Sequence, residues 1–283
     1  MLSSTLLKIK KLLAEKAPFI LVVLGTIVYL NILPNQMFWD DNDFILQNIF
    51  VKDWKYFSKI FTENIIAGAG FISNYWRPFL SFVFSLEWHI WKNWFPGYHA
   101  VSILFHVIDG VLLFFILKKI LKGRYLPFFT ALIFLIHPLQ TEAVAYANSL
   151  GDSLSVFFIF LSLLWYLRFK EENNPVKSRK LYALSLGGYV FALLFKESAF
   201  ILPFLIILID LYEWAKNKKE KLNKADLRIG KTIFLFLAIS ALYLFLRATS
   251  LNFQNTFNFY DQPNAYTENI TVRVLTFSKA LSD

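Results

Sequence analysis

The residues of this sequence best placed to do chemistry are three carboxylates within four positions: Asp40, Asp41 and Asp43, directly after Phe38 and Trp39. Carboxylates this close together repel one another, which raises the pKa of at least one unless a cation compensates. Such a cluster can supply a general base, and its oxygens can hold a divalent cation. The alternative is a solvated acidic turn in which one Asp caps a short helix. The flanking aromatic side chains argue against simple solvation, whereas the spacing fits both interpretations.

A second acidic pair, Glu142 and Asp152, lies in residues 137–152, a segment that contains no Lys or Arg. Two acids without local basic partners suggest a metal or substrate site. The alternative is that Asp152 and Ser153 cap the helix that follows. His137 ends the preceding apolar run near these acids and could serve as a ligand, although a structural role suits it better.

The adjacent charges Lys196 and Glu197 interrupt an apolar stretch, residues 181–211, that has no other charge before Asp210. Each half is about 15 residues long, too short to cross a hydrocarbon core of about 30 Å at about 1.5 Å per residue. The pair must therefore lie near one membrane interface. A charge at the bilayer centre costs about 2.5–3.5 kcal/mol, so we expect a cavity or a polar partner beside these residues. The alternative is a hairpin tip with a salt bridge between the two neighbours.

Arg77 is a candidate to bind phosphate, because a guanidinium at a membrane surface can hold a phosphate group through two hydrogen bonds. An arginine that reaches the lipid headgroups is an equally good interpretation. By contrast, the spacing of His99, His106 and Asp109 puts all three on one helix face, where a buried polar contact between helices is the better explanation.

The elements that must position these residues are membrane helices. Of the 283 residues, 57% are hydrophobic, 19% aromatic and 17% charged, whereas soluble domains are roughly 45–50% apolar and about 25% charged. The composition predicts an all-α, polytopic helical membrane bundle and excludes a soluble or disordered protein. The absence of Cys excludes disulfides and cysteine nucleophiles. The net charge of +9 is explained by helix orientation, without nucleic acid as a partner.

We expect one transmembrane domain over residues 1–283, an external loop with interfacial helices at 34–97, and a chain that continues beyond residue 283. The first span follows a basic tail and lacks a cleavage site, so it is an uncleaved anchor with a cytoplasmic N-terminus. The expected spans are residues 18–33, 98–117, 122–136, 153–167, 181–195, 199–211, 232–246 and 270 to the end.

Residues 78–95 are apolar but contain three Trp and several polar residues, so they could cross the membrane or lie on it. The distribution of Lys and Arg decides between these topologies. If this helix stays outside, the cytoplasmic segments 1–17, 118–125, 168–180 and 214–231 hold 20 of the 29 Lys and Arg residues. If it crosses, the two sets of loops exchange sides, and most Lys and Arg residues would lie outside. This would contradict the positive-inside rule, by which cytoplasmic loops carry the excess of Lys and Arg. We therefore expect an amphipathic helix on the external face.

In this topology half of the acidic residues fall on the external side. Acidic residues contribute little to orientation, so their distribution needs another cause, and chemistry at the outer face is a candidate. The external acids are Asp40, Asp41, Asp43, Asp53, Glu63, Glu87, Glu142, Asp152, Asp261 and Glu268.

The order of these features resembles the transmembrane and tetratricopeptide-repeat O-mannosyltransferases and their bacterial relatives, over most of residues 18–250. Each motif is weak evidence by itself, and the resemblance is specific because the motifs occur in the same order along the chain. In order, they are an anchor helix, Trp39-Asp40-Asp41 with Phe44, Arg77-Pro78, Gly97-Tyr98-His99, His137-Pro138 with Thr141-Glu142-Ala143, Asp152, and Lys196-Glu197.

The resemblance implies a glycosyltransferase of the GT-C fold, with a polyprenyl-phosphate sugar as donor and a hydroxyl of a protein or glycan as acceptor. Such an enzyme would lie in a bacterial inner membrane, or in the endoplasmic reticulum of a eukaryote. The family's acidic pattern falls on Asp40, Asp41 and Phe44, which makes Asp40 the candidate base, with Asp41 beside it. The implied substrate-binding residues are Arg77, Lys196, Glu197, Glu142 and His137.

The expected reaction is a single displacement with inversion, in which Arg77 and Lys196 neutralise the departing lipid phosphate. A divalent cation, Mg²⁺ or Mn²⁺, held by Asp41, Glu142 and Asp152 could do so instead. Relatives commonly carry Gly-Arg-x-Asp at the second acid, whereas this chain has Ser149-Leu150-Gly151-Asp152. A basic contact is therefore missing there.

Two other classes of protein remain as alternatives, a non-catalytic membrane scaffold and a transporter of a lipid-linked substrate. A transporter usually carries charged groups near the membrane midplane and repeat-related broken helices. The acids of this chain instead gather at one face, and no second half matches the first. Sugar transfer at that face is the better fit.

Overall fold

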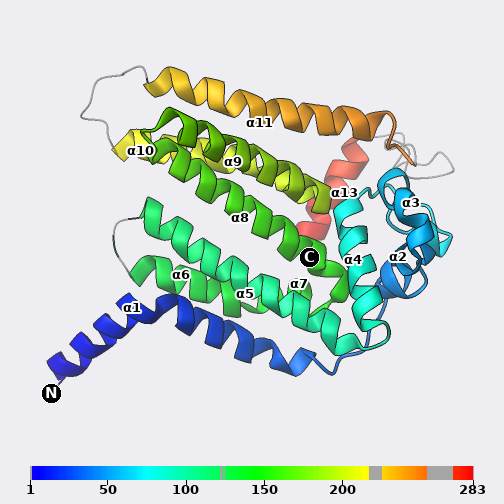
Figure 1. The fold of residues 1–283 in the computed structure, drawn as a ribbon, viewed down its shortest axis with the longest axis horizontal. Coiled ribbons are helices and arrows are strands. Elements are labelled where there is room, and N and C mark those ends of the chain that lie inside the picture. The colour runs from blue at the N-terminus through cyan, green and yellow to red at the C-terminus, as the bar shows by residue number, and fades with distance from the viewer. Residues whose placement is uncertain (1, 122, 124, 217–224, 254–269, 283) are drawn as a thin grey trace.

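The computed structural model describes residues 2–121, 123, 125–216, 225–253 and 270–282. Within these ranges every regular element is a helix and no strand occurs, which confirms the predicted all-α bundle. Asp261, Glu268 and part of the segment 214–231 lie outside the described residues. The long helices run side by side along one direction (Figure 1): α1 (Leu2–Tyr29), α5 (Phe95–Ile120), α6 (Tyr125–Ile136), α8 (Leu150–Glu171), α9 (Pro175–Phe195), α10 (Ile201–Lys216) and α11 (Ala225–Ala248).

Several of these helices are long and apolar enough to cross a membrane. Phe95–Ile120, Ala147–Glu171 and Glu197–Ala215 meet this condition in the described part of the chain. A fourth span results if Tyr125–Ile136 and Pro138–Ala145, which meet at 51°, are counted as one broken helix. These spans confirm a membrane protein. The shorter apolar helices Lys16–Ile32 and Thr232–Ala248 lie where the first and seventh spans are predicted.

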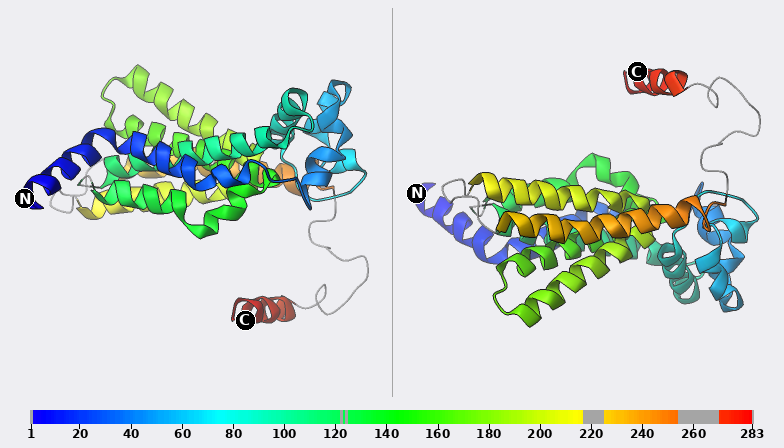
Figure 2. Two further views of the ribbon diagram at one scale, coloured as in Figure 1. Left: turned by 90° about the horizontal axis from the view of Figure 1, so that it is seen from below. Right: turned by 90° about the horizontal axis from the view of Figure 1, so that it is seen from above.

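Short elements cover one end of the bundle. They are α2 (Ile49–Lys52), α3 (Phe57–Thr62) and α4 (Pro78–Trp91), and α4 lies across the ends of the long helices (Figure 1). Figure 2 shows the same arrangement from two sides, with α13 (Ile270–Ser282) apart from the bundle. The orientation of α4 suits a helix that lies along a membrane surface.

Local sequence explains where the helices around the site begin and end. Helix α9 starts at Pro175 rather than at residue 181, because the Asn174 side chain accepts hydrogen bonds from the Val176 and Lys177 amides and proline suits the first helical position. It ends at Lys196, whose backbone is extended, and η7 (Glu197–Phe200) then leads into α10. The charged pair thus marks a real break between two helices.

Helix α5 packs closely on its neighbours and uses the predicted polar face to do so. His106 donates from Nε2 to the Leu135 carbonyl on α6 at 3.0 Å, and His99 donates to the Asn35 carbonyl at 3.2 Å. A Cβ added at Gly110 would lie 2.4 Å from the Leu135 side chain, so glycine permits this approach. Asp109 is buried on the same helix.

Candidate active site

The acidic residues 40–43 form a tight turn between α1 and a single π-helical turn, η2 (Asn42–Leu46). The amides of Asp43 and Phe44 both donate to the Asp40 carbonyl, at 3.1 and 2.9 Å. Trp39, just before the turn, has a positive φ of 52° and a side chain that is 81% exposed. The backbone is therefore bent sharply, which separates the directions of neighbouring side chains.

Asp41 points inward and is completely buried. Its Oδ1 accepts a hydrogen bond of 2.7 Å from the Asn148 amide, and its Oδ2 accepts one of 3.2 Å from the Phe38 amide. Burial raises the pKa of Asp41 to about 6, although the backbone hydrogen bonds oppose the shift. The Asp41 side chain makes no capping bond to the helical turn that follows it. A solvated acidic cap is therefore the wrong description of Asp41.

Asp40 is exposed, and its surroundings are aromatic. Its amide donates to the Tyr146 hydroxyl at 2.8 Å, and Phe38 stacks on the Tyr146 ring with the ring centres 5.0 Å apart. No described residue forms a hydrogen bond or ion pair with the Asp40 carboxylate, so the carboxylate is open to a substrate. Nothing in the sequence indicates that Tyr146 and Asn148 hold the acidic turn, since more than 100 residues separate the partners.

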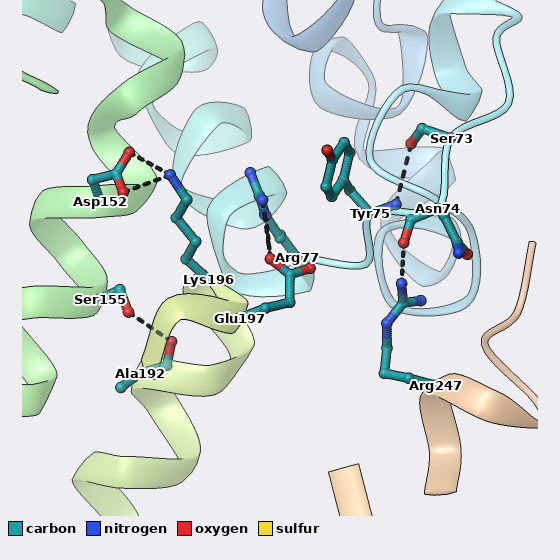
Figure 3. Close-up of polar contacts among 10 residues, drawn as sticks. All are labelled: Ser73, Asn74, Tyr75, Arg77, Asp152, Ser155, Ala192, Lys196, Glu197 and Arg247. Carbon is teal, nitrogen blue, oxygen red and sulfur yellow. Dashed lines mark hydrogen bonds and ion pairs between the residues drawn. The ribbon is translucent and has the colours of Figure 1, made fainter. Parts of the chain in front are cut away.

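Asp152 and Lys196 form an ion pair where α8 begins and α9 ends. Lys196 Nζ lies 2.5 Å from both carboxylate oxygens of Asp152 (Figure 3). The basic partner of Asp152 therefore comes from a break between helices 44 residues later and not from its own segment. The alternative of a salt bridge between the neighbours Lys196 and Glu197 is wrong, since the two side chains have different partners.

Glu197 pairs with Arg77, which lies 120 residues earlier in the chain. Arg77 Nε donates a hydrogen bond of 3.0 Å to Glu197 Oε2, and Nη2 forms an ion pair with the same oxygen at 3.0 Å (Figure 3). The guanidinium also stacks over the Tyr75 ring, 4.6 Å from its centre. Only 12% of the Arg77 side chain is exposed, so this arginine faces the protein and does not extend freely toward lipid headgroups.

Arg247 ties α11 to the same region, a contact that the sequence did not indicate. Its guanidinium donates to the backbone carbonyl of Asn74, three residues before Arg77 (Figure 3). The loop that carries Arg77 is thus fastened both to the break after α9 and to the end of α11.

A shared apolar core lies beneath these polar contacts. Buried apolar side chains from four segments form this core. They are Phe44 and Ile45 after the acidic turn, Leu80 and Phe84 in α4, Ala147 just before α8 with Leu150 at its start, and Phe195 at the end of α9. Because one packed cluster supports all four segments, the acidic turn and the two ion pairs belong to one end of the bundle. The predicted residues Asp40, Asp41, Arg77, Asp152, Lys196 and Glu197 thus lie at the same end of the bundle.

Glu142 and His137 are more peripheral. Both are exposed, and His137 Nδ1 accepts a hydrogen bond from the Leu139 amide at 3.2 Å, which caps η5 (Pro138–Gln140). A structural role for His137 is therefore visible. In the described ranges no three His, Asp or Glu side chains lie close enough to hold a metal ion. Asp41, Glu142 and Asp152 are therefore not gathered into one three-ligand group in the described part of the chain.

The fold and the candidate site define a helical membrane protein in which an acidic turn and two ion pairs lie above a common apolar core. Comparison with curated proteins identifies similar chains that are called protein O-mannosyl-transferases. TMTC2 of Homo sapiens is 29% identical over 90% of this chain and 32% of its own length. Tmtc2 of Drosophila melanogaster is 26% identical over 90% of the chain and 27% of its own.

A third relative, F38B6.6 of Caenorhabditis elegans, is 30% identical over 54% of this chain and 23% of its own length. These relatives confirm the similarity to the transmembrane and tetratricopeptide-repeat O-mannosyltransferases. The chain spans about a quarter to a third of the length of these relatives. No family model matches the chain, and no solved structure matches it.

Proposed function

We propose that this chain is the membrane part of a GT-C-type glycosyltransferase that moves a sugar from a polyprenyl-phosphate donor to a hydroxyl acceptor. The relatives are named protein O-mannosyl-transferases, which favours mannose as the sugar and a protein as the acceptor. The polyprenyl donor follows from the family resemblance. The charge distribution of the loops favours the external face as the side of transfer.

The observation that carries this proposal is the opposite placement of two neighbouring carboxylates. Asp41 is buried and bound by two backbone amides, whereas the carboxylate of Asp40 is exposed and has no partner among the described residues. Carboxylates in different surroundings can take different roles. Asp41 fixes the turn, which leaves Asp40 oriented and available as a base.

In the proposed reaction Asp40 accepts the proton of the acceptor hydroxyl as that oxygen attacks the anomeric carbon. A new carbon–oxygen bond forms on the face opposite the phosphate, and the bond to the phosphate oxygen breaks. The lipid phosphate leaves with the electron pair of that bond, so the anomeric configuration inverts. The acceptor proton remains on Asp40 until it is released to water.

In this proposal Lys196 and Arg77 hold the departing phosphate. Each already pairs with a carboxylate, but an ammonium has three N–H donors and a guanidinium has five, so both retain donors for a phosphate oxygen. Their carboxylate partners fix the positions of the two cations before substrate binds. Such preorganised positive charge stabilises a leaving group better than mobile side chains do.

A product assay on the full-length protein tests the proposal. The protein is reconstituted in liposomes with a panel of polyprenyl-phosphate sugars and a hydroxyl-bearing acceptor protein, and transfer of labelled sugar is measured. We expect transfer from at least one lipid-linked sugar, with mannose preferred. Donor binding without transfer would instead support a scaffold, and movement of the lipid-linked sugar across the bilayer without transfer would support a transporter.

A further inference from the structure

A cavity of about 490 Å³ lies between α5 and α8, away from the acidic turn. Arg168, on its rim, is 16 residues beyond Asp152 on the same helix, which places it about 24 Å along the helix axis at about 1.5 Å per residue. Figure 1 shows that this part of α5 and α8 lies toward the end of the bundle opposite α4. The cavity is therefore separate from the candidate active site.

The lining of the cavity is divided into a basic rim and an apolar wall. Lys118, Lys119 and Arg168 form the rim, and the wall includes Phe115, Leu161 and Trp165. The rim residues belong to the last turns of α5 and α8. The wall residues precede them by one or two turns and thus lie deeper in the predicted membrane. A lipid has the same arrangement, with an ionic headgroup at the membrane surface and an acyl chain deeper in the bilayer.

The charges of the rim are only partly satisfied by protein groups. Lys119 Nζ pairs with Glu171 at 2.5 Å, whereas Lys118 lies 6.0 Å from the centre of the Phe114 ring. No described residue forms a hydrogen bond or ion pair with Arg168. A smaller hollow of about 250 Å³ on another side of Arg168 includes Glu171 and Glu172, so these acids border the arginine but do not line the larger cavity.

We propose that this cavity binds one anionic phospholipid of the cytoplasmic leaflet. Its phosphate contacts Lys118 and Arg168, and an acyl chain lies against Phe115, Leu161 and Trp165. Basic pockets between membrane helices on the cytoplasmic side suit anionic headgroups, and Arg offers a planar pair of donors to phosphate. The choice of leaflet follows from the proposed orientation of the chain, while the lipid site is independent of sugar transfer.

Quenching of Trp165 fluorescence tests the site, because a brominated acyl chain quenches only a nearby indole. Full-length protein is reconstituted in phosphatidylcholine vesicles with either brominated phosphatidylglycerol or brominated phosphatidylcholine. The Trp165 signal is the difference between the native protein and Trp165→Phe. We expect brominated phosphatidylglycerol to quench the Trp165 signal at a several-fold lower mole fraction than brominated phosphatidylcholine does.

Substitutions separate a specific site from general attraction to the membrane. Arg168→Gln should reduce the preference for the anionic lipid about fivefold, the effect of one basic residue near an anionic surface. Arg168→Lys should retain most of the preference. Arg179→Gln, which removes an exposed charge on α9 outside the cavity, should leave it unchanged.

Three outcomes would overturn the proposal. Equal quenching by both brominated lipids would mean that the cavity does not select an anionic lipid. An unchanged preference in Arg168→Gln would remove the basic rim from binding. Loss of the preference on addition of millimolar inorganic phosphate would mean that the rim binds free phosphate and not a lipid.

Discussion

At the scale of single residues, the backbone bend at residues 39–43 gives Asp40 and Asp41 opposite surroundings. The sequence indicates that this acidic cluster is unusual, because it is flanked by aromatic residues. It does not indicate which carboxylate is buried. That choice depends on the amide of Asn148 and the hydroxyl of Tyr146, which reach the turn from a loop more than 100 residues away.

The raised pKa of Asp41 makes protein stability depend on pH. Its folded-state pKa of about 6 exceeds the ordinary value of 3.8, so the folded protein binds this proton more tightly than the unfolded chain does. The resulting stabilisation is complete below about pH 4 and is lost as the pH rises through about 6. We therefore expect the melting temperature in detergent to contain a falling component between about pH 4 and 6.

Asp41→Asn should weaken this pH dependence, because the substituted side chain does not titrate. Asp43→Asn is the matched control, since it also removes one carboxylate from the turn, and the fall should persist in it. A pH profile of Asp41→Asn that equals that of the native protein would show that Asp41 is not the titrating group.

At the scale of helices, much of the arrangement could be predicted from the chain itself. Apolar runs indicate the helices, Asn174 and Pro175 explain the start of α9, and the charges at Lys196 and Glu197 mark its end. The pairing of helix ends could not be predicted. Lys196 could have paired with its neighbour, and only the packing of α8 on α9 brings it to Asp152 instead.

This ion pair predicts different effects for its two members. Lys196→Gln should leave Asp152 without its cation and lower donor affinity by about 1.5–3 kcal/mol if one charged hydrogen bond to phosphate is lost. Asp152→Asn keeps the ammonium of Lys196 but removes the carboxylate that fixes its position, so it should lower donor affinity less than Lys196→Gln does. Donor binding and melting temperature are measured for both variants in one detergent preparation.

A purely structural ion pair would give another pattern. Both substitutions would then lower the melting temperature and leave donor affinity unchanged, which would contradict the assignment of Lys196 to phosphate binding. Lys196→Arg should restore binding only in part, because a planar guanidinium has a different shape from an ammonium.

At the scale of the whole molecule, the charges and the fold support one orientation in the membrane. The acidic turn, α4 and both ion pairs lie at one end, and the basic ends of α5 and α8 lie at the other (Figure 1). The apolar runs of the sequence predict where several of the long helices of the described residues lie. Their packing order could not be predicted, because apolar helix faces resemble one another in sequence.

Cysteine labelling tests this orientation without background, since the chain contains no Cys. In intact cells an impermeant thiol reagent should label Asn42→Cys and Asn93→Cys, which lie at the α4 end of the bundle. Leu121→Cys and Asn173→Cys, at the opposite end, should react only after the membrane is opened. Labelling of Leu121→Cys from outside would mean that α4 crosses the membrane, contrary to the proposed topology.

The central claim is that Asp40 is the base of a sugar-transfer reaction, and transfer by Asp40→Asn tests it most directly. Labelled sugar is followed in a single turnover with the full-length protein, saturating donor and a hydroxyl acceptor, with Asp43→Asn as control. We expect Asp40→Asn to insert and fold normally but to transfer about 10²–10⁴ times more slowly, the usual contribution of a positioned base. The control should retain most of its activity. Transfer by Asp40→Asn at nearly the native rate would contradict the claim.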